Sequence, residues 1–350
     1  MSPKFRGDSD DWLDNPDSSP HKKGQKRSQK GVKKADLSDR KSVTWEEANA
    51  IVAEVFPNLC RISFLGAESK PDLTCSYRRA GVLNQAEGAR QRSPVAVGDR
   101  VLVTQTSPQA GVVEGVSPRR NSLSRLVPGR EDGNLFHVIA ANVDLLVIVA
   151  SAVEPLFVTG LVDRFLVAAE AEGIPTLICI TKIDLASQSD RPWAAYRDLG
   201  YAVVETSVKI KSGLDNLETT IRGKNVVFCG HSGVGKTSLL REFLGEDIGK
   251  VGEVNAATGK GRHTTTSAVR YRLSAETGGP ETGLTGLIDT PGVREFSLKG
   301  ISAENLADFF PEFAQLDCTS RDCHHVSESD CQARSLFRHP SYLRIYQSLL

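Results

Sequence analysis

The feature that most constrains this chain is a glycine-rich pattern set between an apolar strand and a helix. Residues 225–238 read NVVFCGHSGVGKTS, in which Gly230, four residues, Gly235, Lys236 and Thr237 satisfy the phosphate-loop pattern. In such a loop the glycines let backbone N–H groups approach phosphates, the lysine reaches the β- and γ-phosphates, and the hydroxyl ligates Mg²⁺. The pattern therefore predicts an α/β domain that binds a nucleoside triphosphate. The alternative is a glycine-rich turn that binds no ligand.

The residues around this loop predict a parallel sheet covered by helices on both faces. Continuous apolar strand candidates at 144–150, 176–181, 202–207 and 225–230 alternate with helical stretches such as 162–172 and 238–244. Asp289-Thr290-Pro291-Gly292 follows the apolar residues 284–288. An acid at this strand end is suited to holding Mg²⁺ through water, and Gly292 offers a backbone N–H to a γ-phosphate.

A second motif predicts the base. Thr181-Lys182-Ile183-Asp184 follows the strand candidate 176–180. The Asp184 carboxylate can accept the two N–H groups on one edge of guanine, and adenine lacks that pair of donors. The stem of Lys182 can cover the face of the base. The alternative for this motif alone is an exposed Lys-x-Asp turn. Thr206-Ser207-Val208-Lys209, after the next strand, is similar to the Ser-Ala-Lys loop that lies behind guanine in GTPases.

The N-terminal third differs from the rest of the chain in its residue pattern. Residues 1–42 contain few large apolar residues, and seven Lys/Arg with no acid lie between residues 21 and 34, so we expect a disordered basic tail that is able to bind nucleic acid. Residues 44–55 have helical spacing, with Thr44 and Glu47 as a capping box. Short strands are expected at 61–65, 73–77, 95–103 and 112–116, and they predict a small barrel or a sandwich.

A Cys/His cluster near the C-terminus predicts a metal. Cys318, Cys323, His325 and Cys331 offer three thiolates and one imidazole, which match a closed tetrahedral zinc site with a structural role. His324 is a competing ligand, and free surface cysteines are the alternative to a site. The other four cysteines lie in apolar strand contexts and are expected to be core residues. No stretch approaches the roughly 18 apolar residues of a membrane span, and no signal-peptide core is present.

The order of these motifs resembles one family. In most GTPases the phosphate loop precedes the guanine motif, whereas here the order is 181–184, 206–209, 230–237 and 289–292. The sequence is similar in this respect to the circularly permuted ribosome-associated GTPases of the RsgA/YjeQ type, and the stretches 97–101, 137–144 and 162–165 also look like that family. The resemblance implies an OB-fold barrel over residues 44 to about 128. It also implies a small ribosomal subunit as partner in late assembly, contacts to rRNA, and slow hydrolysis that the particle accelerates.

Three positions depart from that family or from GTPases in general. Thr181 stands where the guanine motif usually begins with Asn, and Val208 stands where Ala is usual. Val293 occupies the place of the glutamine that orients the attacking water in many GTPases. Residues 261–266 resemble the family's switch region, in which His263 is our candidate for orienting water and one of Thr264, Thr265 and Thr266 closes on Mg²⁺.

The sequence thus predicts an α/β fold: a circularly permuted P-loop GTPase domain (134–297) with an N-terminal OB-like barrel (43–130) and a C-terminal zinc-binding helical domain (298–350). The expected partners are GTP or GDP with Mg²⁺, one zinc ion, and the small ribosomal subunit with its rRNA. We expect a cytoplasmic monomer without a membrane partner. The expected nucleotide residues are Thr181, Lys182, Ile183, Asp184, Ser207, Val208, Lys209, Gly230, His231, Ser232, Gly233, Val234, Gly235, Lys236, Thr237, Ser238, Asp289 and Gly292. Lys236, His263 and Thr264–Thr266 are the expected catalytic group.

Two other functions remain open on the sequence. One is an RNA-binding assembly factor for which GTP is only an affinity ligand. The other is a P-loop ATPase.

Overall fold

The computed structural model describes residues 43–66, 70–77, 94–126, 136–187, 191–245, 268–273, 285–290, 296–318 and 323–350. The predictions for the tail (1–42), for the switch region with His263 and Thr264–Thr266, and for Pro291, Gly292 and Val293 lie outside these residues. Among the described helices, none has the length and apolar character needed to cross a bilayer.

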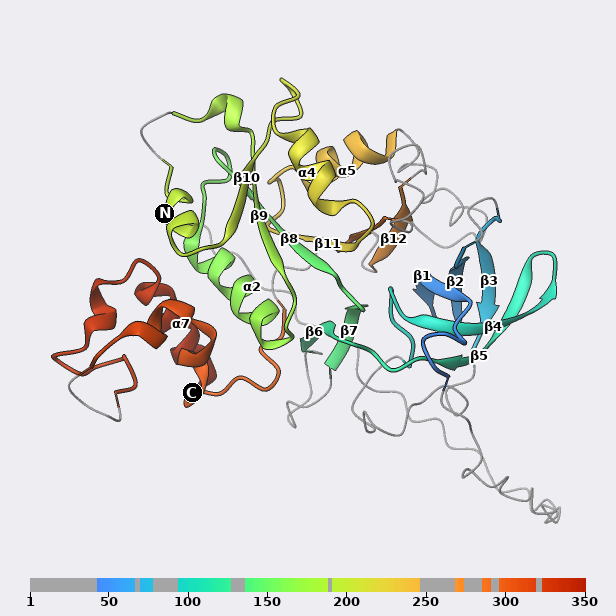
Figure 1. The fold of residues 1–350 in the computed structure, drawn as a ribbon, viewed down its shortest axis with the longest axis horizontal. Helices are drawn as coiled ribbons and strands as arrows, with labels where there is room; N and C mark the ends of the chain where they lie inside the picture. The colour runs from blue at the N-terminus through green and yellow to red at the C-terminus, as the bar shows by residue number, and fades with distance from the viewer. Residues whose placement is uncertain are drawn as a thin grey trace, which may run out of the picture. The chain divides into compact units, whose positions relative to one another are not determined.

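Five strands near the N-terminus form a closed barrel, seen at the blue end of the ribbon in Figure 1. They are β1 (Ala50–Phe56), β2 (Leu59–Phe64), β3 (Leu73–Ser76), β4 (Arg100–Ser107) and β5 (Ala110–Val116). The strand order is β1-β2-β3-β5-β4, and a further β1–β4 pairing closes the ring. All these pairs are antiparallel except β3–β5, which is parallel. This is the strand order of the OB-fold. Of the two predicted alternatives, the barrel is therefore confirmed and the sandwich is wrong.

The helix predicted over residues 44–55 is wrong. The capping box itself forms, because the Thr44 N–H donates to Glu47 Oε2 at 2.9 Å and the Glu47 N–H donates to Thr44 Oγ1 at 3.3 Å. The chain then makes one turn and enters β1. Ile51, Val52 and Val55 are β-branched, and the strand pairs with β2 on one edge and β4 on the other, so tertiary pairing prevails over helical spacing. The strand predicted over 95–103 begins only at Arg100.

The nucleotide domain contributes six neighbouring strands to the sheet, in the order β10-β9-β8-β11-β13-β12. Its strands are β8 (Leu145–Ser151), β9 (Thr176–Thr181), β10 (Ala202–Glu205), β11 (Asn225–Cys229), β12 (Val269–Arg272) and β13 (Gly286–Asp289). They run parallel except for β12, which is antiparallel to β13. The predicted parallel sheet is therefore confirmed, with an antiparallel strand at one side that the sequence reasoning missed.

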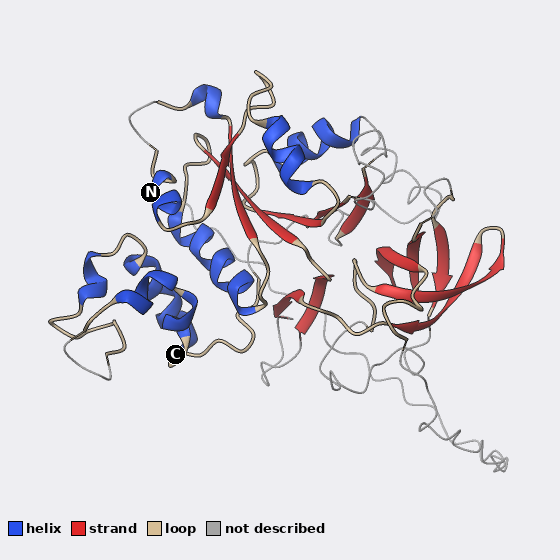
Figure 2. Cartoon of the chain, in the orientation of Figure 1, coloured by secondary structure: helices blue, strands red, loops and turns tan. Residues whose placement is uncertain are grey.

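Helices cover both faces of this sheet, as Figure 2 shows. They are α2 (Thr159–Ala171), α3 (Ala194–Asp198), α4 (Leu214–Ile221) and α5 (Lys236–Leu244). Alternate strand residues such as Ile148 and Ile178 pack against Phe165 of α2. Their neighbours Val147 and Leu177 belong to the core under α4 and α5. Because successive strand residues face opposite sides, each strand is apolar throughout.

Two smaller parts complete the described chain. A ribbon of β6 (Ser122–Leu126) and β7 (Phe136–Ala141) follows the barrel strands. The C-terminal part contains short helical turns η6 (Leu306–Phe309), η7 (Pro311–Gln315) and η8 (Gln332–Ser335), and then helix α7 (His339–Leu349). Its core includes Val167 of α2, so this part packs directly on the nucleotide domain.

Candidate nucleotide-binding site

The phosphate-loop pattern forms the turn that the sequence predicts between β11 and α5. Gly230, Gly233 and Gly235 have φ values of 141°, 83° and 100°. Any other residue is strained in this region of φ. A Cβ on Gly230 would also lie 2.1 Å from the carbonyl oxygen of Val149, so the loop can pass beneath β8 only with glycine there. Helix α5 begins at Lys236, and its N-terminal amides face the loop, which suits an anion.

Lys236 and Asp289 lie together at the end of neighbouring strands. Strand β13 pairs with β11 so that Asp289 stands opposite Phe228, just before the loop. The Lys236 ammonium donates to the carbonyl oxygens of Gly230 (2.7 Å) and His231 (2.9 Å). Burial lowers the pKa of Lys236, and the Asp289 carboxylate acts in the opposite direction. Burial likewise raises the pKa of Asp289, and Lys236 opposes that change. The cation of Lys236 and the anion of Asp289 on β13 thus lie close enough to affect each other.

The guanine motif is bonded directly to the phosphate loop. Thr181 ends β9, and its hydroxyl donates to the carbonyl oxygen of Val234 at 2.5 Å. The Lys182 ammonium donates to the carbonyl oxygen of Gly233 at 2.9 Å. Thr181 therefore joins the two loops with its single hydroxyl.

Ser207 holds the carboxylate that is expected to select the base. Its hydroxyl donates to Asp184 Oδ1 at 2.6 Å, and the backbone N–H of Ile183 donates to the carbonyl oxygen of Thr206 at 3.2 Å. Ser207 is buried, whereas Asp184 is half-buried and so remains open to a ligand on one side. Val208 packs on the core under α4, and Lys209 is exposed. Three segments from separate parts of the sequence therefore form one continuous site.

One contact of this site was missed by the sequence reasoning. The Lys182 ammonium also donates to the backbone carbonyl of Glu154, in the segment between β8 and α2. Pro155 and Leu156 from the same segment line an apolar cavity of about 80 Å³, together with His231 and Val234 of the phosphate loop. No sequence signal marks such a contact, because a backbone carbonyl belongs to every residue type.

The C-terminal cysteines and His325 converge as predicted. The Nδ1 atom of His325 lies 3.7 Å, 3.5 Å and 3.3 Å from the sulfur atoms of Cys318, Cys323 and Cys331. All four ligand atoms lie within 4.8 Å of one another. These separations suit four donors around one ion with metal–sulfur bonds of about 2.3 Å. His324 is not in the group, and its carbonyl instead accepts from Tyr342 at 2.7 Å. The cluster can hold a metal ion.

Comparison with known proteins places this geometry in a family. A family model described as RsgA GTPase matches residues 116–299. A protein named small ribosomal subunit biogenesis GTPase RsgA from Shewanella oneidensis is 39% identical over 259 residues, which are 70% of this chain and 70% of that protein. One of the same name from Chlorobaculum tepidum is 36% identical over 77% of this chain and 89% of its own length. The chain belongs to the RsgA GTPase family.

Solved structures of similar fold agree with this assignment. The crystal structure of YjeQ from Thermotoga maritima has a TM-score of 0.61 and 27% identity, and it covers 86% of this chain and 98% of that one. The crystal structure of YloQ, described as a circularly permuted GTPase, has a TM-score of 0.58 and 26% identity over 86% of this chain and 94% of its own. The predictions of the RsgA family, of a permuted GTPase fold with an N-terminal barrel, and of a GTP-hydrolysing enzyme are confirmed.

Proposed function

We propose that this chain is a GTP hydrolase of small ribosomal subunit biogenesis whose turnover is accelerated by the subunit. One observation supports guanine-nucleotide binding most strongly. Thr181 and Lys182 bond to the phosphate loop, and Asp184, two residues after Lys182, is held by Ser207. A carboxylate and a phosphate cradle at a fixed separation are what a guanine nucleotide requires. The small ribosomal subunit is proposed as the partner because the names of the relatives contain it.

Asp184 selects guanine in this proposal. Its Oδ1 is occupied by the Ser207 hydroxyl, which orients the carboxylate so that it can accept the N–H groups of the base. Adenine would leave the half-buried carboxylate with the Ser207 hydroxyl but without the two N–H donors of guanine, at a cost of about 1–3 kcal/mol or more. Ile183, Val208 and Lys209 complete the surroundings of the base.

Residues 230–238 hold the phosphates with their backbone amides and with Lys236. On binding, Lys236 exchanges its two carbonyl partners for phosphate oxygens, and the added negative charge favours its protonated form. The hydroxyl of Thr237 and the carboxylate of Asp289 are the groups that would hold Mg²⁺, which neutralises charge on the phosphates. Thr237 is exposed at the start of α5 and is therefore accessible.

The water-orienting step belongs to residues outside the described part of the chain. Val293 carries no acid or base, so we propose that His263 orients water and that one of Thr264, Thr265 and Thr266 senses the γ-phosphate. Gly292 would offer its N–H to that phosphate.

The remaining parts bind the particle in this proposal. The barrel (43–130), the C-terminal domain (298–350) and the basic tail (1–42) contact rRNA, largely through phosphates, around the GTPase domain (134–297). Zinc is the metal that three thiolates and one imidazole favour, and it has a structural role because all four positions are filled. The chain acts in the cytoplasm as a monomer.

The test is GTP turnover by the full chain with and without purified small subunits. Acceleration at saturating subunits supports the proposal, whereas equal turnover contradicts it. The alternative, an RNA-binding factor that uses GTP only as an affinity ligand, predicts equal subunit affinity for the GTP- and GDP-bound forms. Measuring both affinities separates the two.

A further inference from the structure

Strand β12 belongs to the nucleotide sheet and to the barrel at once. Val269 pairs with Asp289 of β13 on one edge and with Glu54 of β1 on the other. Glu54 in turn pairs with Arg61 of β2. A single row of backbone neighbours therefore leads from Asp289, beside the phosphate loop, into the wall of the barrel. In the sequence, β12 follows closely after the predicted switch region (261–266), and it is the described strand nearest to that segment along the chain.

Ion pairs reinforce this seam. Arg272 of β12 donates to Asp72 Oδ1 at 2.8 Å and to the carbonyl of Lys70 at 3.3 Å, both beside β3 of the barrel. The same Asp72 lies 3.7 Å from Arg61, which pairs with Glu54 at 2.7 Å. The Glu54 side chain is only 4% exposed, whereas those of Arg61, Asp72 and Arg272 are 21–30% exposed. The charges form a chain from β12 to β1 across the barrel edge.

The pKa of Tyr271 is affected by the carboxylates at both ends of this seam. It is half-buried on β12, two residues after Val269 and thus on the same face of the strand. Burial raises the pKa of Tyr271, and the negative charges of Asp289 and Glu54 both add to the change. The ring therefore lies within electrostatic reach of the nucleotide-side carboxylate and of the barrel carboxylate.

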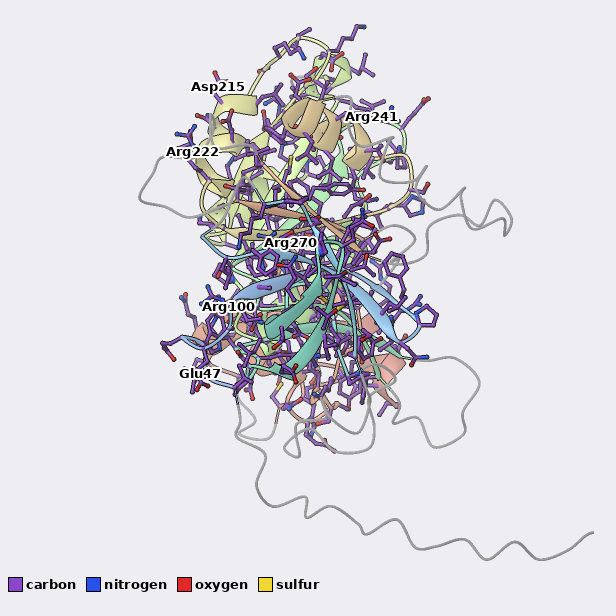
Figure 3. The ribbon with its side chains drawn as sticks, turned by 90° about the vertical axis from the view of Figure 1, so that its right-hand side faces the viewer. Glu47, Arg100, Asp215, Arg222, Arg241 and Arg270 are labelled. Carbon is purple, nitrogen blue, oxygen red and sulfur yellow. The ribbon has the colours of Figure 1, made fainter. Side chains whose placement is uncertain are left out.

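A second link joins β12 to the barrel through Arg270. Arg270 is buried and is labelled near the centre of the view in Figure 3, while Asp215, Arg222 and Arg241 are exposed. The Arg270 guanidinium donates to Asn225 Oδ1 at 2.7 Å.

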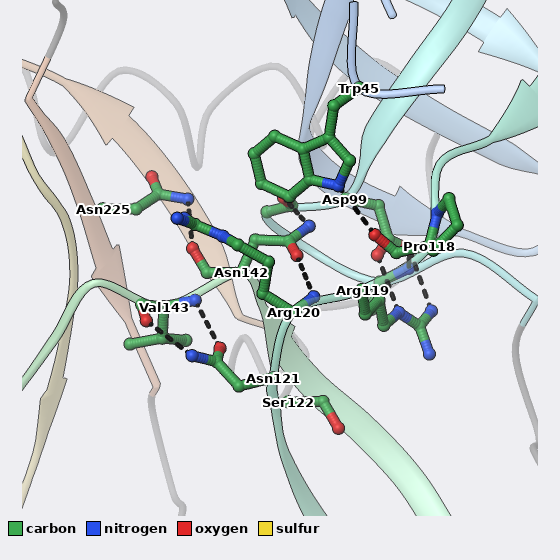
Figure 4. A network of polar contacts seen from close by, with 12 residues as sticks. Trp45, Asp99, Pro118, Arg119, Arg120, Asn121, Ser122, Asn142, Val143 and Asn225 are labelled. Carbon is green, nitrogen blue, oxygen red and sulfur yellow. Dashed lines mark hydrogen bonds and ion pairs between the residues drawn. The ribbon is translucent and has the colours of Figure 1, made fainter. Parts of the chain in front are cut away.

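Asn225 in turn bonds to Asn142, which contacts residues next to the barrel strands, as Figure 4 shows. Its amide donates to the carbonyl of Asn142 at 3.3 Å. The Asn142 side chain donates to the Gly98 carbonyl at 3.1 Å, just before β4, and accepts the N–H of Arg120 at 3.0 Å. Two independent routes thus connect β12 to the barrel.

We propose that Arg272 is a positioning residue for GTP hydrolysis: held by Asp72, it fixes β12 between the barrel and Asp289 and so transmits occupation of the barrel to the nucleotide site. The inference rests on the proposed function for the identity of the occupant. Its physical basis is that a strand paired on both edges cannot shift relative to one neighbour without a change at the other. Arg272 contacts neither nucleotide nor subunit in this scheme.

The test uses the full chain with Arg272→Gln, which removes the charge and keeps most of the side chain. We expect turnover without subunits and affinity for subunits to stay near their wild-type values. The acceleration by saturating subunits should fall about five-fold or more, the lower end of ordinary coupling between sites. Arg272→Lys retains the pair with Asp72 and should restore most of it.

The matched control is Arg222→Gln. Arg222 pairs with Glu218 at 3.2 Å at the exposed end of α4. It should keep the full acceleration. The proposal is overturned if Arg272→Gln and Arg222→Gln are accelerated equally, or if Arg272→Gln loses turnover to the same extent with and without subunits.

A second measurement needs no subunit. Because β12 pairs with β13 on one edge and with β1 on the other, a shift of β12 that accompanies replacement of GDP by a non-hydrolysable GTP analogue should also alter the barrel. Hydrogen exchange of backbone amides in β1 and β2 should differ between the two nucleotides in the wild type and in Arg222→Gln, and the difference should be clearly smaller in Arg272→Gln. If subunits fail to accelerate the wild type while this difference appears, the proposed function fails and the coupling stands. If no exchange difference appears in the wild type, the coupling is wrong.

Discussion

The barrel and the C-terminal domain are attached to the nucleotide domain by different physical means. The barrel shares a strand with the sheet, and its accompanying ion pair Arg272–Asp72 has side chains 22% and 30% exposed. The C-terminal domain packs on helix α2, where Arg338 and Asp163 form a 2.8 Å ion pair with both side chains fully buried. Arg338 also lies over the ring of Phe310, 4.4 Å from its centroid.

The two kinds of attachment are suited to different tasks. A buried ion pair enclosed by aromatic rings is costly to break and therefore fixes one arrangement. A half-exposed ion pair contributes little to stability but can change partners at low cost. The C-terminal domain is accordingly fixed to α2, whereas the barrel is joined through the strand that can report on the nucleotide.

Removal of the metal should have the largest effect, and it should be confined to the C-terminal side. The cluster of Cys318, Cys323, His325 and Cys331 adjoins a small core that includes Phe313 and Tyr342. Binding of a structural zinc ion supplies several kcal/mol of folding free energy or more. A strong chelator should therefore expose residues 298–350 to protease while the barrel stays protected. Equal loss of protection in both parts, or in neither, would contradict the comparison.

Breaking the buried Arg338–Asp163 pair should have the second-largest effect on stability. Arg338→Ala leaves Asp163 without its charged partner in a fully buried position and should lower the free energy of unfolding by about 3–5 kcal/mol. Arg272→Gln, at the barrel, should lower it by less than about 1 kcal/mol. Chemical denaturation of both variants measures the contrast. A cost for Arg272→Gln as large as that for Arg338→Ala would show that the two attachments are alike.

Loss of the Thr181 hydroxyl should affect binding more than folding. Thr181→Val removes the bond to the Val234 carbonyl and keeps the shape, so GDP affinity should fall by about ten-fold, equivalent to roughly 1.4 kcal/mol. Thr181→Ser keeps the hydroxyl and is the matched control. Titration with a fluorescent GDP derivative provides the measurement. Unchanged affinity in the valine variant would mean that the loops are held together without this bond.

The smallest predicted effect concerns pH. Burial raises the folded-state pKa of Asp289 above its ordinary value of 3.8, so the contribution of this carboxyl to stability is present below that pH and is lost as pH rises through the folded-state pKa. Without nucleotide, the wild type should lose stability relative to Asp289→Asn as the pH rises from about 4 towards neutral pH. Melting temperatures across this range test the sign, and a gain by the wild type with rising pH would refute it.

Much of the fold followed from the sequence where pattern and tertiary structure agree. The strand predicted at 176–181 coincides with β9, and the loop at Gly230 has the geometry that its glycines require. The helix predicted at 44–55 failed because its capping box is satisfied locally while the following residues pair as β1. Strand β12 was missed because four residues, VRYR, carry too short a pattern, and their pairing depends on strands far away in the chain.

The candidate site shows the same division. The spacing of motifs indicated which side chains belong together, and the structure brings Thr181, Lys182 and the phosphate loop into contact. The contact of Lys182 with the Glu154 carbonyl and the pair of Arg272 with Asp72 carry no motif. Such contacts arise from the folded path of the backbone and could not be inferred from residue types alone.

The proposed function requires the permuted segments to build one site that selects a guanine nucleotide. Competition for a bound fluorescent GDP derivative tests it most directly, in the wild type and in Asp184→Asn. We predict that GDP and GTP displace the probe from the wild type and that ATP does not, while Asp184→Asn shifts preference from guanine to xanthine nucleotides. Displacement by ATP at concentrations similar to GTP, or an unchanged preference in Asp184→Asn, would contradict the account.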